Sequence, residues 1–122
     1  MVLAVVDDLL FSSKIRAVAG AVGRRAVFAR DHASIATSIR TYKPDLIIFD
    51  LDRAELDPIG AIREIRSQDE LKHVKLVGFA SHIHADLFQQ ARDAGIDLAL
   101  ARSGFVAALP DLLTGHDPAG AS

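Results

Sequence analysis

Residues 2–8 read VLAVVDD and residues 46–50 read LIIFD, so two short apolar runs each end in acidic side chains. Such runs are typical of strands that are buried in a parallel sheet. The carboxyl ends of parallel strands lie side by side, so we expect Asp7, Asp8 and Asp50 to share one crevice. Clustered carboxylates repel one another unless a cation joins them. Mg²⁺, which prefers carboxylate, water and phosphate oxygens, is the predicted cation.

The remainder of the chain alternates apolar runs with amphipathic stretches. This alternation predicts an α/β fold: a doubly wound, five-stranded parallel sheet of the flavodoxin-like (βα)5 type, with helices on both faces. Apolar residues at helical spacing predict a helix after each strand. The predicted strands span residues 2–6, 26–29, 46–50, 74–79 and 98–101.

Punctuating residues agree with this division. Asp31 is predicted to cap the second helix, Asp57 to cap the third, and Gly95 to end the fourth. The fifth helix has weaker signals. Ser103 is its predicted cap, and Pro110 is expected to break it because proline has no backbone N–H to donate.

Size and composition predict one domain over residues 1–114 and a flexible tail over 115–122. The net charge of −2 argues against a nucleic-acid partner. The absence of cysteine excludes disulfides and thiolate metal sites. No apolar run approaches the ~20 residues that cross a bilayer, so a cytoplasmic protein without membrane contact is expected.

Four segments lie at or next to the predicted strand ends: VVDD at 5–8, PDLIIFD at 44–50, VGFASH at 77–82 and AGIDLALAR at 94–102. Together they resemble the receiver domains of bacterial response regulators, and the resemblance covers residues 2 to about 113. It implies that Asp50 is a phosphoryl acceptor. It also implies that Asp7, Asp8 and Asp50 hold Mg²⁺, with the backbone carbonyl of Asp52 as a further ligand.

Two positions depart from the family pattern. Ala80 stands where the family has a hydroxyl residue, and Arg102 stands where it has a lysine. Without a hydroxyl, Ala80 cannot respond to a phosphoryl group by hydrogen bonding. Arg102 could bind a phosphoryl oxygen or form an ion pair with Asp50, and the sequence leaves both open. By the same resemblance, Asp52 and His82 line the route of the water that removes the phosphoryl group.

These features predict a single-domain response regulator in a two-component phosphorelay. Mg²⁺-dependent phosphoryl acceptance on Asp50 would control partner binding, and no enzyme activity is expected beyond the protein's own phosphorylation and dephosphorylation. The expected partners are a histidine kinase or phosphotransfer protein and a downstream protein target, and the sequence leaves open whether the chain forms a homodimer.

Alternative interpretations remain open. The same fold could serve as a pseudo-receiver that binds proteins without phosphorylation. The segment FDLDRAELD at 49–57 also resembles the D-x-D signature of haloacid-dehalogenase-type phosphatases, although it lies mid-chain. Asp7 and Asp8 could simply cap a helix. His82 and His84 are interpreted as solvated loop residues, because no third zinc ligand is evident.

Overall fold

The computed structural model describes residues 1–116, in which five parallel strands form one sheet in the order β2-β1-β3-β4-β5. The strands are β1 (Val2–Val5), β2 (Ala26–Ala29), β3 (Leu46–Asp50), β4 (Lys75–Ala80) and β5 (Leu98–Ala101). The helices are α1 (Leu9–Ala21), α2 (Ala33–Tyr42), α3 (Pro58–Arg66), α4 (Ala85–Ala94) and α5 (Arg102–Leu113), with short 3-10 turns η1 (Ala54–Leu56) and η2 (Asp69–Leu71).

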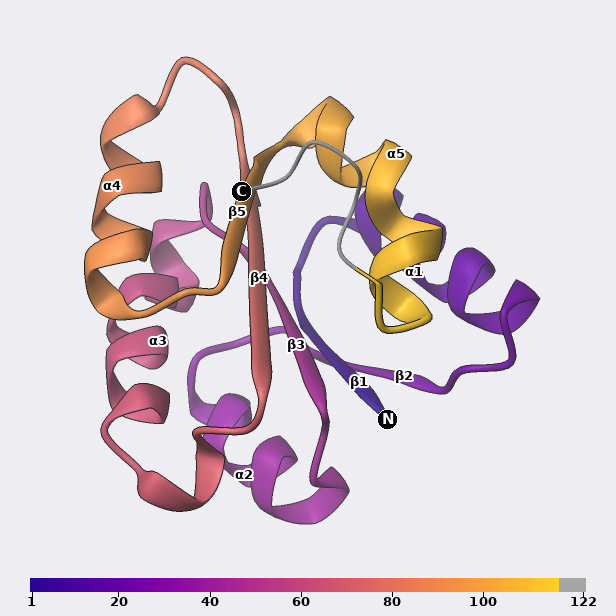
Figure 1. Ribbon diagram of the computed structural model, residues 1–122, viewed down its shortest axis with the longest axis horizontal. Helices are drawn as coiled ribbons and strands as arrows, with labels where there is room; N and C mark the ends of the chain where they lie inside the picture. Colours follow the sequence, from indigo (N-terminus) through magenta and orange to yellow (C-terminus); the bar gives the residue numbers. More distant parts are fainter. Residues whose placement is uncertain (117–122) are drawn as a thin grey trace.

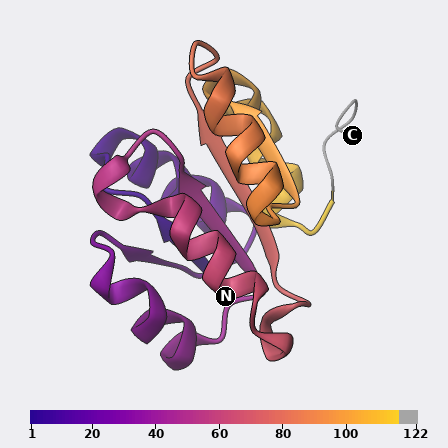
Figure 2. The same cartoon turned by 90° about the vertical axis from the view of Figure 1, so that its left-hand side faces the viewer.

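Helices cover both faces of the sheet (Figure 1). On one face, α1 and α5 pack over a core that includes Phe11, Phe79 and Phe105. On the other, α2, α3 and α4 lie side by side in front of the sheet (Figure 2). The predicted doubly wound α/β fold is confirmed. None of the helices described is long and apolar enough to cross a membrane.

The strands begin and end close to the predicted positions, and β4 is shifted by one residue at both ends. It starts at Lys75 instead of residue 74, and the Val74 N–H bonds to the Leu71 carbonyl of the preceding turn. The strand then continues through Ala80, which is fully buried and pairs with Ala101 of β5. Ala80 therefore lies inside the sheet at its carboxyl edge, next to the site.

Two of the predicted helix boundaries are confirmed, and the third is one residue off. The Asp57 carboxylate, at the cap position of α3, accepts a hydrogen bond from the Gly60 N–H. At the start of α2 the cap position is His32, which makes no side-chain cap bond, while the Asp31 carboxylate one residue earlier accepts from the Ser34 N–H. Gly95 ends α4 with φ at 108°, in the left-handed region that glycine adopts without a steric penalty.

Both predictions for the fifth helix are wrong. α5 begins at Arg102, directly after β5, with Ala101 at the cap position and no side-chain cap bond, and Ser103 lies exposed in the first turn. The helix also continues through Pro110 to Leu113. Near the end of a helix, proline removes only one backbone hydrogen bond. Pro110 is exposed, whereas Leu112 and Leu113 are buried. Burial of those leucines outweighs the lost bond.

Candidate functional site

Asp50, the last residue of β3, is fully buried at the centre of the carboxyl edge of the sheet. Its Oδ1 accepts a hydrogen bond from the Asp52 N–H at 3.0 Å and lies 3.4 Å from Arg102 Nη2. Its Oδ2 is buried with no hydrogen-bond partner among the residues described. Burial raises the pKa of Asp50, and the charge of Arg102 and the Asp52 amide oppose that rise without cancelling it. A buried carboxylate with an unpartnered oxygen is costly, which is typical of functional sites.

Arg102, the first residue of α5, joins two carboxylates. Its Nη2 faces Asp50 Oδ1, and its Nε donates to Asp52 Oδ2 at 3.0 Å. The guanidinium also lies over two aromatic rings, 4.8 Å from the centroid of Phe11 and 5.3 Å from that of Phe79. The ring faces and the two acids together fix its position. In this structure Arg102 therefore forms the ion pair that the sequence left open.

Asp52 has more hydrogen-bond donors around it than any other carboxylate of the site. Its Oδ2 accepts from the Ser81 N–H at 2.9 Å in addition to Arg102, and its Oδ1 lies 2.8 Å from His84 Nδ1. An ionised carboxylate can only accept, so His84 Nδ1 carries the proton of this bond. Burial raises the pKa of Asp52, but hydrogen bonds from His84, Ser81 and Arg102 outweigh it, and the pKa lies below the usual value.

The two acids after β1 already have protein partners. Asp7 Oδ2 forms an ion pair with Arg53 Nη2 at 2.6 Å, and both side chains are half-exposed. Asp8 Oδ1 caps α1 by accepting from the N–H groups of Leu10 at 2.7 Å and Phe11 at 3.3 Å. Within residues 1–116, no three acidic or histidine side chains are grouped closely enough to hold a metal ion.

The donor chemistry of the site nevertheless fits a hard divalent cation. Asp50 Oδ2 is a buried anionic oxygen without a partner, and the ion pair of Asp7 with Arg53 shows that this edge attracts positive charge. Mg²⁺ binds through one or two carboxylates and keeps several waters, so it does not require a complete protein cage. Asp7, Asp8, Asp50 and the carbonyl of Asp52 therefore remain the predicted ligands.

Three site residues were missed or misjudged from the sequence. His84, interpreted as solvated, is 47% exposed and bonds to Asp52, whereas His82 is exposed and makes no hydrogen bond in the described part of the chain. Arg53 was not singled out, although it directly follows Asp52. Ser81 contributes through its backbone N–H, which no side-chain pattern reveals. Ala80 brings no donor to the site.

Comparisons with known proteins rest on structure alone, since no family model and no curated protein matches the sequence. A receiver domain from Bermanella marisrubri superposes with a TM-score of 0.81 at 24% identity, over 93% of both chains. The receiver domain of a Pseudomonas aeruginosa sensor histidine kinase, with magnesium in its active-site cleft, gives 0.79 at 25%, also over 93% of both. This chain has the receiver-domain fold. A phosphorylated cyanobacterial phytochrome response regulator gives 0.76 at 23%, over 93% of this chain and 88% of its own.

The receiver fold thus places Asp50, Asp52, Ala80 and Arg102 at one edge of the sheet, as their sequence positions predicted. Ala80 and Arg102 lie next to each other at this edge, since Ala80 pairs with Ala101, the residue before Arg102.

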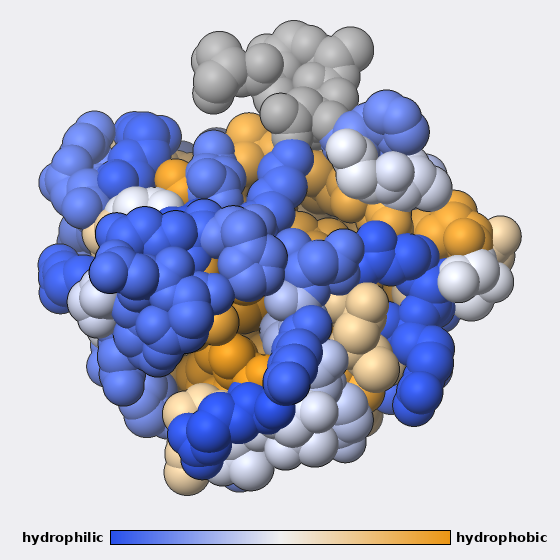
Figure 3. All heavy atoms as spheres, turned by 60° about the horizontal axis from the view of Figure 1, so that its bottom comes forward, coloured by the Kyte–Doolittle hydropathy of each residue, from blue (hydrophilic) through white to orange (hydrophobic). Residues whose placement is uncertain are grey.

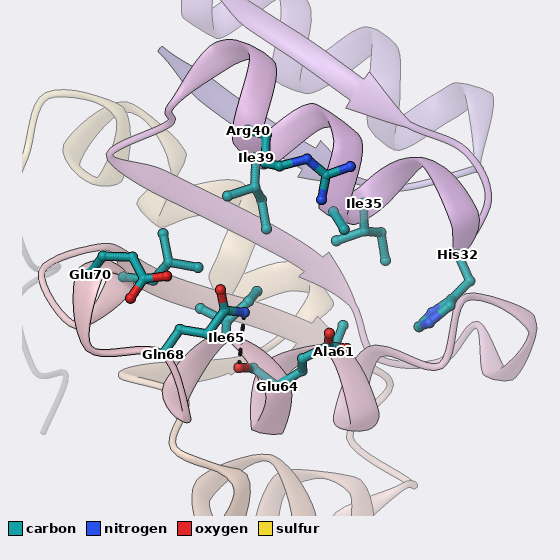
Figure 4. Close-up of a pocket in the computed structure, with 11 residues that line it drawn as sticks. His32, Ile35, Ile39, Arg40, Ala61, Glu64, Ile65, Gln68 and Glu70 are labelled. Carbon is teal, nitrogen blue, oxygen red and sulfur yellow. Dashed lines mark hydrogen bonds between the residues drawn. The ribbon is translucent and has the colours of Figure 1, made fainter.

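A separate groove lies between α2 and α3, with a volume of about 260 Å³. In Figure 4, Ile35, Ile39 and Ile65 line its interior, and Arg40, Glu64 and Glu70 lie around its rim. Figure 3 turns the lower part of Figure 1 forward and shows a largely hydrophilic face with apolar atoms visible between charged side chains. None of the carboxylates at the sheet edge lines this groove.

Proposed function

We propose that the chain is a response-regulator receiver domain that accepts a phosphoryl group on Asp50. The observation that supports this most is the fully buried Asp50 carboxylate, with one oxygen unpartnered and one facing Arg102, at the carboxyl end of the central strand. The donor would be a histidine kinase or phosphotransfer protein, and the phosphorylated domain would act through a downstream protein. These partners follow from the receiver fold, so they are proposed by analogy.

Phosphoryl transfer requires the protein to position the nucleophile and to neutralise the charge of the phosphoryl group. A carboxylate oxygen of Asp50 attacks the phosphorus of the donor, the new O–P bond forms, and the bond to the donor's leaving group breaks. Arg102 lies where it can neutralise a phosphoryl oxygen, because its Nη2 already faces Asp50 Oδ1. Mg²⁺ would be held by Asp7, Asp8, Asp50 and the Asp52 carbonyl, and when bound it would neutralise charge on the transferring phosphoryl group. Attack requires ionised Asp50, which the neighbouring positive charge favours against burial.

Intact mass after incubation with acetyl phosphate tests this function directly. We expect the wild type to gain the mass of one phosphoryl group when Mg²⁺ is present, and we expect no gain with Asp50→Asn or with chelator. A matched control is Asp57→Asn, which changes an exposed helix cap outside the site and should leave the gain intact. Absence of any gain in the wild type would contradict the proposal.

Thermal unfolding tests the metal site separately. Millimolar Mg²⁺ should raise the melting temperature of the wild type, because a ligand that binds only the folded state stabilises it. Arg53→Met should enlarge the shift, since the Arg53 guanidinium competes with the cation for Asp7. Asp8→Asn should abolish it while retaining the helix cap, because asparagine also accepts at that position. Equal shifts in all three proteins would place Mg²⁺ elsewhere.

The main alternative is a pseudo-receiver that binds partners without phosphorylation. It is favoured by the ion pairs of Arg102 with Asp50 and Asp52, which engage the guanidinium that a phosphoryl group would need, and by the lack of a hydroxyl at Ala80. The haloacid-dehalogenase interpretation has less support, because the similar structures are receivers matched over nearly their whole length.

A further inference from the structure

Three hydrogen-bond donors from two segments of the chain converge on the Asp52 carboxylate. Arg102 Nε comes from the start of α5, the Ser81 N–H follows the end of β4, and His84 Nδ1 comes from the residue before α4. The three distances are 3.0, 2.9 and 2.8 Å. A guanidinium, a backbone amide and an imidazole N–H that face one small anion are the elements of an oxyanion-binding site. Here the anion is a side chain of the protein itself.

This arrangement lies directly beside Asp50. Arg102 contacts both carboxylates at once, and the Asp52 N–H donates to Asp50 Oδ1. A phosphoryl group carried by Asp50 would therefore need a guanidinium that Asp52 already holds. Asp52 and that group are both anionic and would repel each other at this separation. The Asp52 carboxylate and the phosphoryl group would therefore compete for hydrogen bonds from the Arg102 guanidinium.

We infer that the Asp52 carboxylate is an internal ligand of an oxyanion site made of Arg102, Ser81 N–H and His84, and that an incoming phosphoryl group or free oxyanion must displace it. The part that concerns the phosphoryl group rests on the proposed function, whereas the occupied oxyanion site does not.

Displacement of Asp52 would also transmit phosphorylation to the loop that follows β4. Residue 80 has no hydroxyl, so the chain that follows β4 is joined to the site through the Asp52 contacts with Ser81 and His84. When Asp52 is displaced, both contacts are lost and the segment from 81 to 84 is released. The segment includes Ile83, an exposed aliphatic side chain that would move with it.

Nuclear magnetic resonance titration with inorganic phosphate, in metal-free buffer with chelator, tests the occupied site without phosphorylation. The reporters are the Ser81 amide and the Arg102 side-chain Nε–H. We expect Asp52→Ala to bind phosphate at least about ten-fold more tightly than the wild type, with shifts at both reporters. Glu55→Gln removes an equal charge from an exposed neighbour and should behave like the wild type. Equal affinity in the wild type and Asp52→Ala would overturn the inference.

Asp52→Asn guards against a folding defect, because it keeps the side-chain size and removes only the charge. It should bind phosphate more tightly than the wild type, and no gain in a folded Asp52→Asn protein would also count against the inference. A second arm measures the phosphorylated fraction with acetyl phosphate and Mg²⁺, which should rise in Asp52→Ala. If Asp50 gains no phosphoryl group in any variant, the proposed function fails while the phosphate titration still decides the oxyanion site.

Discussion

Arg102→Met should lower the free energy of unfolding by about 3 kcal/mol at neutral pH. The substitution leaves the fully buried Asp50 carboxylate without its cationic neighbour and removes one donor from Asp52. Breaking a buried ion pair costs roughly 3–5 kcal/mol, and the low end applies because Arg102 is 32% exposed and water screens part of the interaction. Methionine retains an unbranched apolar stem against Phe11 and Phe79, so the loss is mainly electrostatic.

The pH dependence follows from Asp50. Burial raises its pKa in the folded state, and the pKa should rise further without Arg102. A carboxyl group with a raised folded pKa favours the folded state at low pH, and this contribution is lost as pH rises through that pKa. The difference in the free energy of unfolding between the wild type and Arg102→Met should therefore be largest at neutral pH and become smaller at acidic pH. Urea unfolding at a series of pH values measures it.

A double variant provides the control. Asp50→Asn removes the buried charge that Arg102 compensates, so Arg102→Met should cost much less in the Asp50→Asn background. An equal cost in both backgrounds would show that Arg102 stabilises the protein through Asp52 or through packing and not by compensating the charge of Asp50.

The positions of the main acids were predictable because they depend on strand ends. Apolar runs define β1 and β3, parallel strands bring their carboxyl ends together, and Asp7 and Asp50 therefore reach the same edge of the sheet. β3 and β4 are also parallel neighbours, and their register places Asp50 opposite Phe79 near the same edge. Such features depend on backbone topology more than on individual rotamers.

The partners of those acids were not predictable, because they depend on loops and side-chain geometry. The pairing of Arg53 with Asp7 joins residues on two different loops. The contacts of Asp52 with Ser81 and His84 depend on the path of the chain after β4, which has no periodic pattern. Arg102 was the one cation that could be predicted at the site, because it directly follows a predicted strand.

The prediction for the fifth helix was wrong for a different reason. Proline and a weak cap are local signals, and both argued for a short or broken helix. Tertiary contacts overrode them, since Phe105, Leu109 and Leu113 are each almost completely buried against the core. Helices in proteins owe most of their stability to such packing.

Phe79→Ala should lower the free energy of unfolding by about 3–5 kcal/mol. The ring is fully buried and stacks between Phe11 and Phe105, at 4.6 Å from each centroid, so truncation leaves a cavity between three elements. Phe28→Ala is the matched control, because Phe28 also lies beneath arginine side chains but is only half-buried, on an edge strand. Its cost should be clearly smaller, and urea unfolding of both variants measures the difference.

The same substitution should disturb the site as well as the core. Phe79 and Phe11 present the ring faces on which Arg102 rests, and Arg102 is what joins Asp50 to Asp52. With Phe79 truncated, the Arg102 side-chain Nε–H resonance should shift and broaden in the folded variant, whereas Phe28→Ala should leave it unchanged. An unshifted Arg102 signal in Phe79→Ala would mean that the two carboxylates alone fix the guanidinium, so the ring contacts would contribute to the core and not to the site.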